Sequence, residues 1–108
     1  MTLEEDKVAR RTVVEILTNE HRNRVGKRVS AAMALAAKEA SFAVYKEHLE
    51  RENSGDPGWG PNYSHDENQI KFLKRDLELA TASEKVTALA MEYVLKFFLD
   101  QLDAAVVK

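Results

Sequence analysis

One short stretch of the chain holds all but one of its glycines and both of its prolines. It runs from Asn53 to Ser64 and reads Asn-Ser-Gly-Asp-Pro-Gly-Trp-Gly-Pro-Asn-Tyr-Ser. Glycine adopts positive φ readily and proline lacks a backbone donor, so neither a helix nor a central strand can run through this stretch. The sequence therefore predicts two long regular halves joined by one irregular loop, residues 53–64.

Both halves carry signals that favour helix. Thr2 with Glu5, and Ser64 with Glu67, have the spacing of a capping box, in which a hydroxyl and a carboxylate bind free backbone donors. Alanine, the best helix former, dominates the later part of the first half. The predicted helices run from Thr2 to about Thr18 or His21, from Arg28 to about Glu52, from Ser64 to about Ala82 and from Ser83 to about Val106.

Two junctions decide how many helices the chain forms. The polar segment Asn23–Gly26 contains the one outlying glycine and predicts a break or bend in the first half. Thr81–Glu84 repeats the capping-box spacing and predicts a break in the second half. One continuous helix through either junction is left open. We expect a single all-α domain over residues 1–108, an antiparallel four-helix array arranged like a bundle.

The helices predicted for residues 28–52 and 83–106 are apolar over more than half of their circumference. In the first of them, one row consists of Ala32, Ala36 and Ala40, and a neighbouring row consists of Leu35, Phe42, Tyr45 and Leu49. In the second, the run of residues 93–99 contains Lys96 as its single charge. A monomeric bundle of this size has little interior for so much apolar surface. We therefore expect a homo-oligomer, with a dimer favoured, and place residues 28–52 at the centre of the bundle.

Two aromatic residues of the loop are candidate partner-binding residues. Trp59 lies between two glycines, and Tyr63 follows near the end of the loop. Aromatic side chains on a loop offer a large contact area at small entropic cost, and tryptophan is enriched in binding hot spots. The alternative is that Trp59 folds back and anchors the loop on the helices.

Basic residues gather in the first half, although the net charge of the chain is -2. Between Lys7 and Arg28 there are seven basic residues against two acidic ones. Such a cluster can contact the phosphates of a polyanion, and the candidate residues are Arg22, Arg24, Lys27 and Arg28. The acidic overall balance disfavours nucleic acid as the partner. Polyanion binding requires these side chains to converge on a surface without acids, whereas pairing with Asp or Glu would argue against it.

His21 lies in the run Asn-Glu-His-Arg-Asn-Arg-Val, residues 19–25. This run loosely resembles the phosphorylated box of sensor histidine kinase dimerisation helices, in which a histidine projects from a four-helix bundle. The resemblance implies phosphoryl transfer at His21, because its ring nitrogen is a nucleophile at neutral pH. The run lacks the proline and the asparagine spacing of such boxes, and no nucleotide-binding domain accompanies it. Phosphotransfer requires an exposed His21 ring in the middle of a helix.

No pattern of residues points to an enzyme, a cofactor or a metal site. The serines lack the glycines of a nucleophile elbow, cysteine is absent, and His48 and His65 lack the Glu-x-x-His spacing of di-iron bundles. The N-terminus lacks a secretory signal and no stretch is apolar enough for a bilayer, which favours a cytoplasmic protein without a membrane partner. We expect a small non-catalytic interaction or regulatory protein that self-associates and binds a protein partner. The alternatives are polyanion binding and phosphotransfer at His21.

Overall fold

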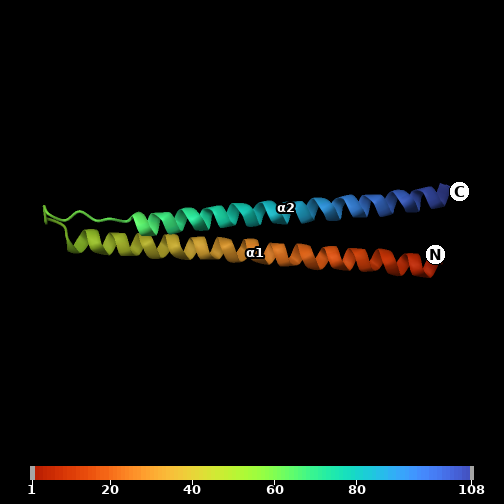
Figure 1. Cartoon of the computed structure of the whole chain (residues 1–108), viewed down its shortest axis with the longest axis horizontal. Coiled ribbons are helices and arrows are strands. Elements are labelled where there is room, and N and C mark those ends of the chain that lie inside the picture. The colour runs from red at the N-terminus through yellow and green to blue at the C-terminus, as the bar shows by residue number, and fades with distance from the viewer. Residues whose placement is uncertain (1, 108) are drawn as a thin grey trace.

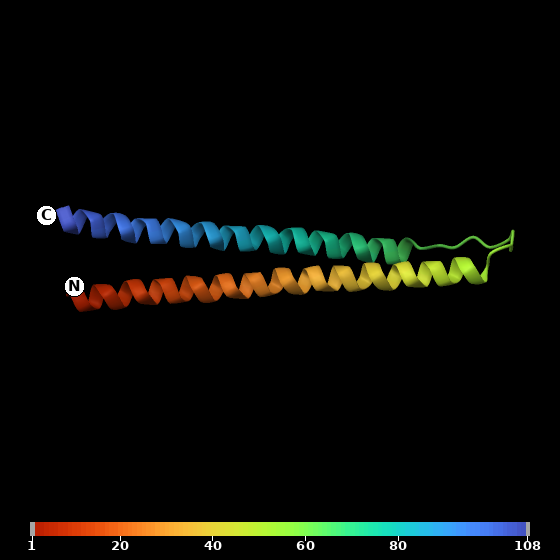
Figure 2. The same ribbon diagram turned by 180° about the vertical axis from the view of Figure 1, so that it is seen from behind.

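The chain folds into two long helices that run antiparallel, side by side. The computed structural model describes the backbone of residues 2–107 and the side chains of residues 2–98. Helix α1 spans Leu3–Glu52 and helix α2 spans Ser64–Val107. Both chain ends lie at one end of this hairpin and the loop lies at the other (Figures 1 and 2). The hairpin measures 84 × 19 × 16 Å, so it is an extended rod.

The expectation of four helices in a bundle is wrong, whereas the all-α class is confirmed. α1 continues without a break through Asn23–Gly26, and α2 continues through Thr81–Glu84. The continuous helix that the sequence left open at each junction is the one that forms. The capping box of Thr2 and Glu5 is present at the start of α1, as predicted.

Local contacts explain why both junctions stay helical. One glycine in a helix interior costs about 1 kcal/mol, which is too little to end a helix that continues favourably on both sides. Arg24 also pairs with Glu20, one turn earlier, at 2.6 Å across the expected break in α1. In α2, the Thr81 hydroxyl donates to the carbonyl of Leu77 at 2.8 Å and therefore does not cap a new helix.

The two helices meet along a seam with a seven-residue repeat. Half-buried residues recur along both helices at alternating spacings of three and four, which is the pattern of a coiled coil. His21 lies opposite Thr87, and the guanidinium of Arg10 lies over the ring of Phe98, which defines the register. The seam residues of α1 are Arg10, Val14, Leu17, His21, Arg24, Arg28, Ala31, Leu35, Lys38, Phe42 and Leu49. They face Tyr63, which directly precedes α2, and the α2 residues Asp66, Ile70, Leu73, Leu77, Ala80, Glu84, Thr87, Met91, Val94 and Phe98.

This seam does not enclose an apolar core. Among residues 2–98, no apolar side chain is buried, and Thr87 is the one buried residue, at 3% exposure. The prediction that residues 28–52 form the centre of a bundle is wrong, because the Ala36 and Ala40 side of that segment faces solvent. A pair of helices covers only one side of each, so apolar residues on the remaining sides stay exposed.

Hydrogen bonds order both ends of the loop. The backbone N–H of Asn53 caps α1, and Gly55 follows with φ at 93°, a conformation that residues with a Cβ rarely adopt. At the other end, the Asn62 side chain accepts from the backbone N–H of Ser64 at 3.0 Å. The predicted loop 53–64 is confirmed to within one residue, since α2 begins at Ser64.

Candidate interaction surface

The middle of the seam is polar. The Thr87 hydroxyl donates to the carbonyl of Glu84 on its own helix at 2.8 Å and lies 2.7 Å from Nδ1 of His21. A hydroxyl has one proton, so the second hydrogen bond requires the proton of Nδ1 and makes His21 its donor. This bond joins α1 to α2 at the one buried residue in the described part of the chain.

Two arginines add further bonds between the helices. Arg28 forms an ion pair with Glu84 across the seam, with the two side chains 36% and 21% exposed. Arg24 donates to the backbone carbonyl of Ser83 at 3.1 Å and also donates to the carboxylate of Glu20 on its own helix. A shift of one helix along the other would leave these half-buried polar groups without partners. The polar middle therefore specifies the register of the hairpin.

These contacts place the candidate polyanion residues on different sides of α1. Arg24 and Arg28 lie in the seam and pair with acids, whereas Arg22 and Lys27 are exposed. The four side chains do not converge on a surface free of acids, so the condition for polyanion binding is not met. The ring of His21 is half-buried against Thr87, so the open approach that phosphotransfer requires is also missing.

A line of large apolar side chains follows the outer side of α2. Phe72, Leu79, Val86 and Tyr93 are 67%, 60%, 60% and 73% exposed and recur at every seventh residue. We call these four residues the outer row. A seven-residue repeat drifts by only about 20° per step on an α-helix, so the row is nearly straight. Each member follows a seam residue by two positions, which places the row about 130° around α2 from the centre of the seam.

A charged residue precedes each member of the outer row, and the signs alternate. We call these residues, Lys71, Glu78, Lys85 and Glu92, the charged row. All four are exposed, and none makes an ion pair within the part of the chain that the structure describes. Neighbouring members are about 10 Å apart along the helix axis, which is too far for them to pair with each other. The charged row is thus available to a binding partner.

The two candidate residues of the loop have different surroundings. The ring of Tyr63 packs edge-on against Phe42 with centroids 5.4 Å apart, and Nζ of Lys46 lies 5.4 Å from the Tyr63 centroid. Its hydroxyl is shielded from solvent and has no hydrogen-bond partner among the described residues. This burial, followed by the charge of Glu50, raises the pKa of Tyr63. Trp59 is half-buried within the loop. Partner binding by either residue stays a prediction.

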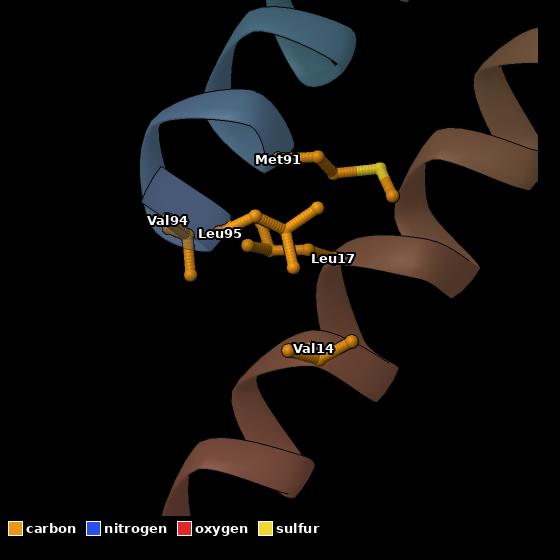
Figure 3. Close-up of a pocket in the computed structure, with 5 residues that line it drawn as sticks. All are labelled: Val14, Leu17, Met91, Val94 and Leu95. Atoms are coloured by element: carbon orange, nitrogen blue, oxygen red, sulfur yellow. The ribbon is translucent and has the colours of Figure 1, made fainter. Parts of the chain in front are cut away.

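An apolar notch lies between the helices near their terminal end. Val14, Leu17, Met91, Val94 and Leu95 line it, and Figure 3 shows Leu17 and Met91 reaching toward the opposite helix. The notch has a cavity volume of about 20 Å³, whereas pockets for small ligands usually exceed about 300 Å³. All five lining side chains are apolar, so no polar group is present to orient a cofactor. We interpret the notch as imperfect packing of the seam.

Metal-ligating side chains stay dispersed. No group of three His, Cys, Asp or Glu side chains in the described residues could hold a metal ion. His48 instead lies 3.3 Å from Glu52 one turn further along α1, and Asp66 pairs with Lys38 of the other helix at 2.8 Å. Over the same residues, neither helix has a segment with the length and hydropathy needed to cross a bilayer.

Comparisons with known proteins do not indicate a function for the outer row, so its function is inferred from its own residues. No family model, curated protein or solved structure matches this chain. Sequence reasoning missed the outer row, because it looked for apolar surface only in residues 28–52 and 83–106. The signal that could have found it is the seven-residue spacing that begins at Phe72.

Proposed function

We propose that this protein is a non-catalytic helical interaction protein, which acts by packing the outer row of α2 against an α-helix. The outer row is the observation that carries this proposal. Isolated exposed apolar residues are common on protein surfaces, but a straight line of four large ones at coiled-coil spacing is a surface shaped for another helix. The partner is a helix of a second copy or of another protein.

The rest of the hairpin supports this interpretation. Its long, narrow shape offers a continuous helical surface, and the polar middle of the seam holds that surface in one register. The exposed apolar residues extend to α1, where Ile16 and Val44 are 59% and 68% exposed. Trp59 and Tyr63 offer a second, smaller contact at the loop end, which we propose as an accessory site for a protein partner.

Site-specific photo-crosslinking in cells that produce the protein tests the proposal. A photoreactive residue replaces Leu79 in the outer row, Trp59 in the loop or, as a control, Lys74, which is exposed on a different side of α2. We expect strong adducts from position 79, weaker ones from position 59 and few from position 74. Equal yields from positions 79 and 74 would contradict the proposal, and so would the absence of adducts from position 79.

A further inference from the structure

The hairpin exposes far more surface than a compact chain of its mass. A folded monomer of 12.2 kDa has an accessible surface of about 6,000 Å², whereas this hairpin has 8577 Å². The excess is about 2,500 Å². A stable interface removes about 800 Å² from each partner. The hairpin therefore exposes enough surface to form one additional interface along α2.

The charged row identifies what the outer row binds. When two copies of α2 run antiparallel with Leu79 of one copy beside Val86 of the other, Phe72 lies beside Tyr93. The apolar residues then form a closed ladder of four contacts. In the same register Lys71 faces Glu92 of the second copy, and Glu78 faces Lys85. All four members of the charged row are paired, and the surface is complementary to itself.

We propose that the outer row of α2 binds the outer row of a second copy in this antiparallel register. The inference rests on the proposed function and names the partner of the same surface. Charges beside a helix–helix interface set partner choice and orientation in coiled coils, so the charged row specifies this arrangement. The dimer joins two hairpins through α2, and the loops of the two copies lie at opposite ends of the assembly.

Other registers are disfavoured by the same charges. Shifting one copy by a heptad places Glu78 opposite Glu92 and Lys85 opposite Lys85 of the second copy, or Lys71 opposite Lys85 and Glu78 opposite Glu78. A parallel arrangement also fails to pair the charged row with itself, because its two-fold axis runs along the helices and places the charged rows of the two copies on opposite sides of the interface. The alternating signs therefore select one register among those that the apolar repeat allows.

The residues at the midpoint and at the end of the outer row fit the proposed antiparallel dimer. The two-fold axis passes near Ala82 and Ser83, whose small side chains let the two helices approach closely. At the end of the row, an open hollow lies between Gln69, Phe72 and Leu73. In the proposed register this is where the ring of Tyr93 from the second copy arrives.

A charge-exchange experiment tests the partner. Glu78→Lys makes the centre of the charged row basic, and Lys85→Glu makes it acidic; neither residue makes an ion pair within the described hairpin, so both variants should fold with unchanged circular dichroism. In sedimentation equilibrium, each variant alone should dimerise roughly tenfold more weakly than the unmodified protein. A mixture of the two variants, or the double variant E78K/K85E, should recover the affinity because opposite charges face each other again.

Spin labels determine the orientation. The chain has no cysteine, so Ala82→Cys and Asn68→Cys each introduce one labelling site. An antiparallel dimer brings the two labels at position 82 close together but separates those at position 68 by about 40 Å. Short distances at both positions would show a parallel pair and overturn the proposal. A single 12.2 kDa species at 100-micromolar concentration would also overturn it, while adducts with other proteins at position 79 would leave the proposed function intact.

Discussion

The middle of the seam between the helices and the outer row of α2 have opposite chemistry. The middle of the seam holds His21, Arg28, Glu84 and Thr87, whereas the outer row consists of large apolar side chains in contact with solvent. A chain that folds for its own stability alone would be expected to exchange these positions. The middle of the seam specifies how the two helices align, and in the dimer that we propose the outer row contributes to stability only after association.

The strongest test of this comparison makes the seam apolar. The variant His21→Leu/Arg28→Leu/Glu84→Leu/Thr87→Val should raise the free energy of unfolding by about 3 kcal/mol, because apolar packing usually exceeds the net gain from half-buried polar pairs. Urea unfolding followed by circular dichroism at a fixed protein concentration measures the change.

The single variant Glu84→Leu is the control for that test. It leaves the guanidinium of Arg28 without its carboxylate and should lower the free energy of unfolding by about 1 to 2 kcal/mol. A quadruple variant less stable than the unmodified chain would show that the polar middle contributes stability beyond setting the register.

A matched pair of leucine truncations compares the seam with the outer row directly. Leu77→Ala removes a half-buried seam side chain and should cost about 2 kcal/mol at every protein concentration. Leu79→Ala removes a side chain that is 60% exposed in the hairpin, so it should cost less than about 0.5 kcal/mol at sub-micromolar concentration. At high concentration, where association covers the outer row, its cost should approach that of Leu77→Ala. Equal costs for Leu79→Ala at both concentrations would contradict a role of the outer row in association.

The polar middle of the seam also explains why the sequence predicts the loop and the all-α class but not the number of helices. The Gly/Pro loop and the all-α class follow from local chemistry, because proline and glycine limit the backbone wherever they occur. The number of helices does not follow, since His21, Arg24 and Arg28 occupy three successive seam positions. Apolar periodicity is the main signal for a continuous amphipathic helix, and polar residues at the seam interrupt it in the way that a helix end does.

The candidate sites depended on contacts that are distant in the sequence. Arg24 and Arg28 belong to a basic cluster in the sequence, and only the approach of α2 brings Glu84 to Arg28. Similarly, Tyr63 is a loop residue in the sequence, and its contact with Phe42 follows from the antiparallel pairing of the helices. The outer row required no tertiary information, because a seven-residue repeat can be recognised directly in the sequence.

A test with a smaller expected effect concerns Gly26 of α1, which lies next to the polar middle of the seam. Gly26 faces open space, and a Cβ added there would meet no atom within 4 Å. Gly26→Ala should therefore raise the free energy of unfolding by about 0.8 kcal/mol through the higher helix propensity of alanine. Thermal unfolding followed at 222 nm checks this expectation. A loss of stability would mean that α1 bends at Gly26 in solution and that the seam is interrupted there.

The smallest expected effect lies at the loop end of the seam, where Tyr63 packs against Phe42. Because the raised pKa of Tyr63 favours its neutral phenol in the folded hairpin, the associated stability is complete below the ordinary tyrosine pKa of about 10 and is lost as the pH rises through the raised value. The difference between the alkaline absorbance titrations of the unmodified protein and Tyr63→Phe should thus have its midpoint above pH 10. A midpoint at or below the ordinary value would show that the Tyr63 hydroxyl is solvated, and that the seam ends before the loop.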